Sequence, residues 1–304
     1  MSPAPTGRYA PSPTGTLHLG NLRTALLAWL FARSAGARFL MRIEDLDVGR
    51  VREAFVGEQL ADLAALGLDW DGEPVRQSAR LERYDDALAR LEAQGLLYPC
   101  FCTRAEIREA ASAPHRAPAE GAYPGTCRAL SRAGRSAREA AGRPRALRVD
   151  AGAAEIAFTD RLAGPVSGVV DDFVVRRSDG VHAYNLAVVV DDAEQGVREV
   201  VRGADLLDST PRQLWLASAL GVEAPASHAH VPLVLGPDGA RLAKRHGAVT
   251  LADRAAQGQE PEAVRAELAA SAGLCAADER PSPAELVARF DPALLPREPA
   301  VYAT

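Results

Sequence analysis

Short apolar runs and helix-spaced apolar residues alternate along the first 95 residues of the chain. A strand-like run at residues 7–10 precedes the loop PSPTGTLHLGN, and helical spacing then begins with Leu22, Ala25, Leu26, Trp29 and Leu30. Residues 38–43 read as a second strand that ends at Glu44, and helical spacing returns over about 53–66 and 81–94. This order predicts an α/β fold with a parallel sheet, and ligands bind at the carboxyl ends of such strands.

The pattern changes at about residue 97. Residues 97–150 are rich in alanine, arginine, glycine and proline, which indicates an insertion in the sheet. Alternation returns at residues 172–193 and 197–203, which we interpret as later strands carrying Tyr184 and Arg202, followed by a helix over about 205–220. The segment after Gly247 is expected to be mostly helical and to add no strand. We therefore predict a main Rossmann-type domain over residues 1–246, interrupted by the insertion, and a short helical segment over 247–304.

Composition narrows the class of protein. The sequence has no run of about 18 uncharged apolar residues and no basic-then-apolar start typical of a secretory signal, so we expect a cytoplasmic protein, not associated with a membrane, and a monomer. A formal net charge of −5 argues against indiscriminate binding of nucleic acid, although a local basic patch can still bind a polyanion. The basic stretch Arg128–Arg148, with seven arginines and one acidic residue, fits either a tRNA contact or a solvated linker.

Lysine is almost absent from the chain. Of 35 basic residues, 34 are arginine and one, Lys244, is lysine. A compact ammonium on a flexible stem differs from a planar guanidinium at a phosphate site, so the single lysine is a candidate functional residue.

Two short motifs carry the candidate chemistry. His18-Leu19-Gly20-Asn21 stands at a predicted helix start, where backbone N–H groups attract anions and a glycine lets a nucleotide approach closely. Residues 241–247, RLAKRHG, follow the turn GPDG and place Lys244 on a loop able to close over a phosphate.

Together these motifs resemble a known family. RYAPSPTGTLHLGNLRTAL is similar to the "HIGH" region of glutamyl-tRNA synthetases, and RLAKRHGAV is similar to their "KMSKS" loop. The resemblance covers about residues 7–247 and implies a class I synthetase-type Rossmann fold. Arg241 and Ala243 depart from the lysine and serine usual in that loop, so only its second lysine is kept, as Lys244.

The resemblance implies roles for named residues. It places L-glutamate against Arg8, Tyr9, Ala10, Pro11, Ser12, Glu44, Tyr184 and Arg202. It places ATP, brought with Mg²⁺, against His18, Gly20, Asn21, Arg241, Leu242, Ala243, Lys244 and Arg245. His18 and Lys244 are the expected catalytic residues, with Lys244 stabilising charge on the departing pyrophosphate.

Three of the four cysteines indicate a metal site. Cys100, Cys102 and Cys127 with one further ligand would make a closed tetrahedral zinc site that stabilises the insertion. Resemblance to short members of the family, in which Cys-x-Cys is followed by Tyr-x-x-x-Cys, implies Tyr123 as the fourth ligand. His115 is the alternative, and three buried free thiols are the non-metal reading.

The expected acceptor is an RNA nucleoside. Only 57 residues follow Gly247, which leaves no room for an anticodon-binding domain, so the chain most resembles the short paralogues, the glutamyl-Q tRNA(Asp) synthetases. These paralogues glutamylate queuosine in the anticodon of tRNA(Asp). The alternatives are a truncated or split glutamyl-tRNA synthetase that charges the 3′ end of tRNA(Glu), and a synthetase-like RNA or amino-acid binder without catalysis.

Overall fold

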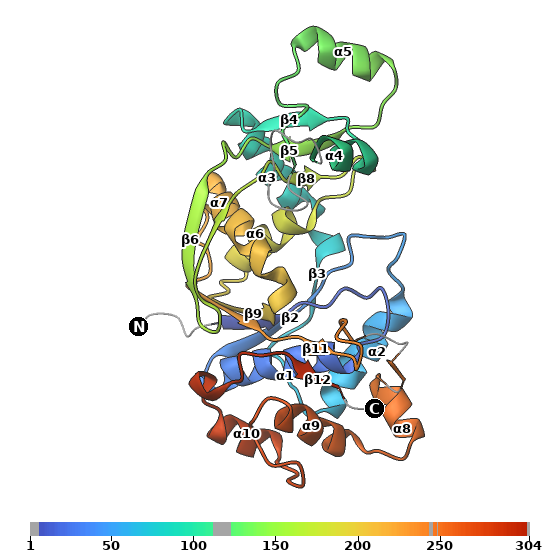
Figure 1. Cartoon of the computed structure of the whole chain (residues 1–304), viewed down its shortest axis with the longest axis vertical. Helices are drawn as coiled ribbons and strands as arrows, with labels where there is room; N and C mark the ends of the chain where they lie inside the picture. Colours follow the sequence, from blue (N-terminus) through green and yellow to red (C-terminus); the bar gives the residue numbers. More distant parts are fainter. Residues whose placement is uncertain (1–5, 112–122, 243–245, 248, 303–304) are drawn as a thin grey trace.

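A parallel sheet lies at the centre of the structure, a computed structural model that describes residues 6–111, 123–242, 246–247 and 249–302 (Figure 1). Three strands pair in the order β1-β2-β3, and a second parallel pair lies beside β1, where the Arg198 N–H donates to the Thr6 carbonyl over 2.8 Å. These strands are β1 (Thr6–Tyr9), β2 (Arg38–Ile43), β3 (Val75–Arg76), β9 (Glu199–Gly203) and β10 (Ser227–Val231). The predicted α/β class is confirmed.

Helix α1 (Leu19–Ser34) is apolar on nearly all sides because it lies between two layers. One side contacts β1 and β9, and the other contacts two helices of the C-terminal segment. A helix buried all round, such as α1, packs into a core rather than presenting a polar face to solvent.

The predicted helices at 53–66 and 81–94 are confirmed as α2 (Glu53–Ala65) and α3 (Leu81–Ala93), the latter preceded by the 3₁₀ turn η1 (Gln77–Arg80).

Two strands of the insertion form a separate layer with a third strand from beyond it. Strands β4 (Leu97–Cys100), β5 (Ala146–Val149) and β8 (Val174–Arg176) pair antiparallel, with α4 (Arg104–Ala111) beside them. Helix α5 (Arg132–Ala140) projects beyond this layer at the far end of the molecule and buries no residue (Figure 1). The basic stretch is therefore partly helical rather than an unstructured linker.

One prediction in the second half was wrong. Tyr184 was expected in a strand but begins helix α6 (Tyr184–Glu194), because the run LAVVVDD is buried between α3 and α7 and shows no polar face. The predicted helix at about 205–220 is confirmed as α7 (Thr210–Leu220), preceded by the 3₁₀ turn η2 (Ala204–Ser209). An antiparallel hairpin of β6 (Glu155–Asp160) and β7 (Gly164–Val169) was not predicted, since its alanine, glycine and proline residues are poor strand formers.

The regular structure of the C-terminal segment consists mainly of short helices, as predicted, although they cover slightly fewer than half of its described residues. It contains α8 (Leu251–Ala256), α9 (Pro261–Ala270), α10 (Pro283–Arg289) and the 3₁₀ turn η4 (Pro292–Leu294). The expectation of no further strand was wrong, because β12 (Ala300–Val301) pairs in parallel with β11 (Val234–Leu235). Across the described ranges, no helix has the length and apolar character needed to cross a membrane.

Candidate active site

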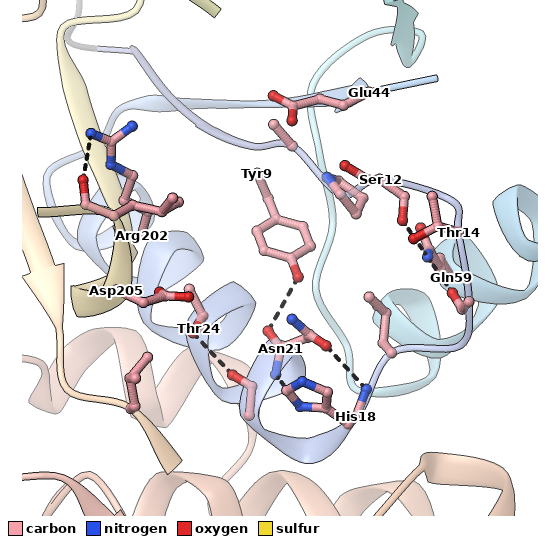
Figure 2. A pocket seen from close by; sticks show the side chains of 18 of the residues that line it. Tyr9, Ser12, Thr14, His18, Asn21, Thr24, Glu44, Gln59, Arg202 and Asp205 are labelled. Carbon is pink, nitrogen blue, oxygen red and sulfur yellow. Dashed lines mark hydrogen bonds between the residues drawn. The ribbon is translucent and has the colours of Figure 1, made fainter. Parts of the chain in front are cut away.

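A cavity of about 490 Å³ opens where β1, β2 and β9 end and α1 begins (Figure 2). It brings together twelve of the residues predicted for glutamate and ATP: Arg8, Tyr9, Ala10, Pro11, Ser12, His18, Gly20, Asn21, Glu44, Tyr184, Arg202 and Arg241. Leu242 does not line it, because its side chain is buried in the core. Ala243, Lys244 and Arg245 lie outside the described residues.

His18 is the N-cap of α1 and lies at one end of this cavity. Its Nδ1 accepts the Asn21 N–H over 3.2 Å, and the Asn21 side chain accepts the His18 N–H in return. Burial, aided by the charge of Arg241, lowers the pKa of His18 to about 4. The imidazole is therefore neutral near pH 7, and with Nδ1 accepting, its proton sits on Nε2, which leaves an N–H donor for a ligand oxygen.

Gly20 has a steric reason to be glycine. A Cβ at this position would lie 3.0 Å from two atoms of the His18 ring. A side chain at this position would therefore require the capping imidazole to shift by a few tenths of an ångström. Arg241, the first residue of the segment 241–247, lines the same cavity and pairs there with Asp205 over 2.6 Å.

Arg8 and Glu44 belong to a buried charge cluster that we define as Arg8, Arg42, Arg80, Glu44, Asp191 and Asp192. Arg42, which is fully buried, reaches Asp192 at 2.7 Å, Glu44 at 3.5 Å and Asp191 at 3.7 Å. Asp192 also accepts from Arg8 over 3.2 Å. Arg80 pairs with Asp191 at 2.7 Å and also with the partly exposed Glu194. Within the buried cluster three guanidinium groups thus face three carboxylates, and Arg8 is held at the wall of the cavity.

The pKa values within this cluster follow from that arrangement. Burial lowers the pKa of Arg42, but Asp192, Glu44 and Asp191 outweigh burial and raise it overall. Burial raises the pKa of the Asp192 carboxyl, yet Arg8 and Arg42 outweigh it and lower the net value. For Glu44, burial prevails over Arg42 and Arg8 and the pKa is raised. Glu44 is therefore the member whose charge a cationic ligand would most stabilise.

Arg202, in β9, lies on the wall of the cavity opposite this cluster and is 5% exposed. Its guanidinium donates to the Gln213 side chain and the Thr210 hydroxyl, each over 2.8 Å. Figure 2 shows Arg202 and Glu44 away from His18, with the Tyr9 ring between them. The cavity thus has a charged end suited to an acidic amino acid and a helix N-terminus suited to a phosphate.

Sequence reasoning missed several lining residues. The Gln59 amide, 1% exposed, donates to the carbonyls of Ser12 and Gly15 and fixes the loop before α1. Asp205 forms an ion pair with Arg241, and the Thr24 hydroxyl donates to the Gly20 carbonyl. A polar residue at a buried helical position, as in Gln59, was the only sequence signal for these supports.

A second cleft of about 720 Å³ shares Ser12, Thr14, Glu44 and Tyr184 with the first cavity. It extends toward the insertion, and its wall carries four guanidinium groups, those of Arg50, Arg104, Arg148 and Arg177. Acidic groups also face it, and Arg177 pairs with Asp179 over 2.5 Å and with Asp47 over 3.5 Å. A polyanion that entered this cleft would reach the charged end of the first cavity.

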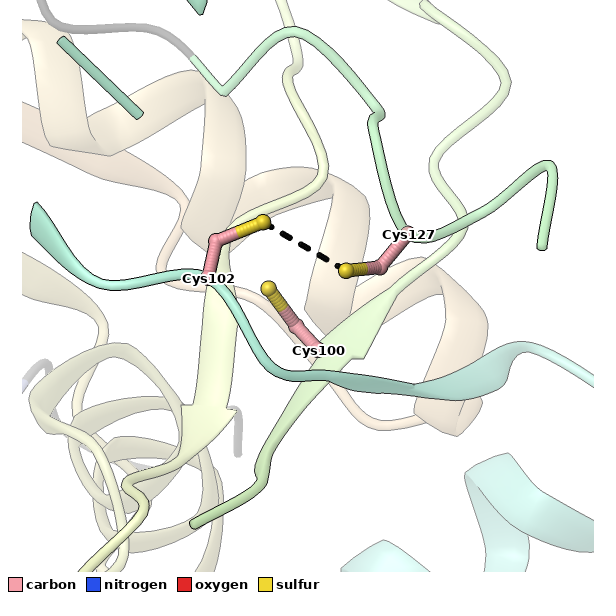
Figure 3. Close-up of side chains that lie close together, drawn as sticks. All are labelled: Cys100, Cys102 and Cys127. Atoms are coloured by element: carbon pink, nitrogen blue, oxygen red, sulfur yellow. Dashed lines mark hydrogen bonds between the residues drawn. The ribbon is translucent and has the colours of Figure 1, made fainter. Parts of the chain in front are cut away.

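The three cysteines predicted as metal ligands lie together in the insertion (Figure 3). The sulfur atoms of Cys100, Cys102 and Cys127 all lie within 4.8 Å of one another. The Tyr123 hydroxyl lies 3.4 Å from the Cys100 sulfur and 3.6 Å from that of Cys102. Tetrahedral zinc with the usual bond lengths separates two sulfurs by about 3.8 Å and a sulfur from an oxygen by about 3.5 Å, so the four side chains fit such a site. His115 lies outside the described residues.

Comparisons with known proteins agree with this geometry. Residues 6–279 match the family described as "tRNA synthetases class I (E and Q), catalytic domain". The chain is 62% identical to the glutamyl-Q tRNA(Asp) synthetase of Nocardia farcinica over 96% of this chain and 91% of the relative, and 57% identical to that of Symbiobacterium thermophilum over 96% and 94%. A glutamate tRNA ligase from Elizabethkingia meningosepticum, solved in complex with its amino acid, superposes with a TM-score of 0.82 at 28% identity, over 99% of this chain and 67% of that one. The chain therefore belongs to the class I aminoacyl-tRNA synthetases of the glutamate and glutamine (E and Q) group.

Proposed function

We propose that the protein activates L-glutamate with ATP and transfers the glutamyl group to queuosine in the anticodon of tRNA(Asp). The observation that carries the first half is the convergence of Arg8, Arg202 and Glu44 in one cavity that ends at His18 on a helix N-terminus. Two guanidinium groups suit two carboxylates, and one buried carboxylate suits one ammonium.

The residue roles follow from the shape of the cavity. Glutamate lies at the charged end, with its carboxylates toward Arg8 and Arg202 and its ammonium toward Glu44, while residues 9–12 and Tyr184 complete the wall. ATP lies toward His18, Gly20 and Asn21, next to Arg241 at the start of the segment that carries Lys244. Its Mg²⁺ neutralises phosphate charge, as in other phosphoryl-group transfers.

The reaction proceeds in two group transfers. An oxygen of the glutamate α-carboxylate attacks the α-phosphorus, and the bond to pyrophosphate breaks to give glutamyl-adenylate. The His18 Nε2–H donates to a phosphate oxygen and Lys244 stabilises the charge on pyrophosphate. A ring hydroxyl of queuosine then attacks the glutamyl carbonyl carbon, the bond to AMP breaks, and the hydroxyl proton passes to the departing phosphate. Positioning and electrostatics supply the rate, since no covalent enzyme intermediate is needed.

The acceptor is inferred from the relatives. Glutamyl-Q tRNA(Asp) synthetases resemble this chain at 43–62% identity. The chain covers 91% of the relative from Nocardia farcinica and 94% of that from Symbiobacterium thermophilum. The arginine-lined cleft beside the glutamate end offers a route for a nucleoside with its flanking phosphates. Charging of tRNA(Glu) is the second candidate, favoured by the structural likeness to glutamate tRNA ligases.

In the insertion, we infer one structural zinc ion held by Cys100, Cys102, Cys127 and Tyr123. The ion would tie β4 to the segment before α5 around a small apolar cluster. No catalytic step passes through it.

Transfer of labelled glutamate tests the acceptor. We expect label on tRNA(Asp) that carries queuosine, retention of label after the 3′ CCA end is removed, and no label on tRNA(Asp) from queuosine-deficient cells. Glutamate-dependent ATP–pyrophosphate exchange without tRNA is the matched assay of the first step. Charging of tRNA(Glu) that requires an intact CCA end would overturn the queuosine assignment and leave the first step standing.

A further inference from the structure

The guanidinium group of Arg202 is fully engaged by the protein. All five of its N–H bonds have acceptors: His230 Nε2 at 3.0 Å, Gln213 Oε1 at 2.8 Å, Thr210 Oγ1 at 2.8 Å, and Tyr184 Oη and the Leu206 carbonyl at 3.3 Å each. The two longest bonds go to residues that line the cavity. A ligand carboxylate can replace those two, while the three shorter bonds keep the guanidinium plane in place.

The bond to His230 fixes the tautomer of that histidine. Arg202 Nε–H is a donor, so His230 Nε2 must accept, and the ring proton must sit on Nδ1. Nδ1 lies 2.6 Å from Asp160 Oδ2, and both side chains are fully buried. Asp160 is itself held, because its Oδ1 accepts backbone N–H groups of Leu162, Ala163 and His230 at 2.9, 2.9 and 3.2 Å.

We propose that Asp160 and His230 form a positioning dyad, which sets the plane of the Arg202 guanidinium for the carboxylate of an acidic amino acid. The inference rests on the proposed function, in which Arg202 binds glutamate. Asp160 comes from the end of β6 and His230 from β10, so the hairpin that sequence reasoning missed supplies the anchor of the substrate-binding arginine. Neither dyad residue touches the cavity, so each acts through Arg202.

Asp160→Asn is the sharpest perturbation. The amide oxygen can still accept the backbone N–H groups, but the amide N–H₂ then faces His230 Nδ1, which must become an acceptor. The ring proton moves to Nε2, the same tautomer change as when the aspartate of a catalytic triad becomes asparagine. This proton can still donate to the Thr210 hydroxyl at 3.2 Å, but the Arg202 Nε–H loses its acceptor and faces another donor. We expect the KM for glutamate in ATP–pyrophosphate exchange to rise about 10–100-fold, the effect of leaving buried donors unpaired, with the KM for ATP within about two-fold.

A second variant separates positioning from general damage. His230→Gln places an amide oxygen near the position of Nε2, and this oxygen accepts from Arg202 whatever stands at residue 160. Adding His230→Gln to Asp160→Asn should therefore recover most of the lost glutamate affinity. Two merely structural defects would instead accumulate. His228→Gln is the matched control, because His228 lies on the same strand at 5% exposure and its ring packs on Phe158 and His230.

Nitrogen-15 NMR of the imidazole gives a readout independent of activity. The wild-type spectrum should show Nε2 of His230 unprotonated, and Asp160→Asn should exchange the states of the two nitrogens. An unchanged KM for glutamate in Asp160→Asn, or a double variant worse than the single one, would overturn the dyad. Absence of glutamate-dependent exchange in the wild type would instead reject the proposed function, while the NMR measurement would still test the dyad.

Discussion

Arg42→Met should destabilise the protein by about 3–5 kcal/mol at pH 7, the cost of removing one partner from a buried ion pair. Arg42 is fully buried and reaches three carboxylates within 3.7 Å, whereas methionine fills similar space without charge. The cluster then has two guanidinium groups, Arg8 and Arg80, against three carboxylates, so one buried negative charge is uncompensated. The loss is a large part of a typical stability of about 5–15 kcal/mol.

The pH dependence of this deficit is a stricter test. The uncompensated charge raises the pKa of a cluster carboxyl in the folded protein above its unfolded value, and burial already raises that of Glu44 above 4.5. The folded variant then binds more protons than the unfolded chain above about pH 4.5, so its stability falls as pH rises. Urea unfolding followed by circular dichroism should show a larger deficit relative to wild type at pH 7 than at pH 5.

The matched control is Arg83→Met. Arg83 is 59% exposed and pairs with the partly exposed Glu194 over 3.1 Å, so we expect a change below about 0.5 kcal/mol. An Arg42→Met variant within about 1 kcal/mol of wild type at pH 7, or a deficit that grows on acidification, would refute the reasoning.

Two further predictions concern the metal site and Lys244. Metal analysis should find about one zinc per chain, and a metal-free protein that stays folded and active would reject the site. Tyr123→Phe should weaken zinc retention against a chelator and His115→Ala should not. The reverse pattern would reassign the fourth ligand. Lys244→Ala should lower glutamate-dependent pyrophosphate exchange by about 10²-fold or more, the effect of losing one preorganised transition-state donor, and activity within two-fold of wild type would contradict its role.

Much of the fold and site follows from local signals in the sequence. The residues around His18 combine a loop, a capping pair and an apolar helix, and the structure places them as predicted. Cys100 and Cys102 are one residue apart at the end of β4, and Cys127, 25 residues beyond Cys102, joins them in space as the motif indicated. Tyr184 was misplaced because its helix is buried on several sides, so that a β-branched run shows no helical periodicity.

Long-range polar contacts were beyond sequence reasoning. Arg42 meets residues about 150 positions away, and Asp160 meets His230 across 70 positions. No spacing rule connects such residues, and each alone reads as an ordinary surface charge. Their buried partners become visible only when hairpin and sheet are assembled, which is why the supports of Arg8 and Arg202 escaped prediction while the arginines themselves did not.

The position of α1 bears on how the enzyme could be shortened. Arg23, 1% exposed and five residues beyond His18, donates to the Pro232 carbonyl and, in the C-terminal segment, to both the hydroxyl and the carbonyl of Ser271. The same helix lies against α9 and α10. A fragment that stopped before α9 would expose this face of α1 to water and leave Arg23 without its two acceptors on Ser271, the hydroxyl and the carbonyl. Helices α9 and α10 therefore support α1 from the side opposite the sheet, and we expect a shortened enzyme to require both of them.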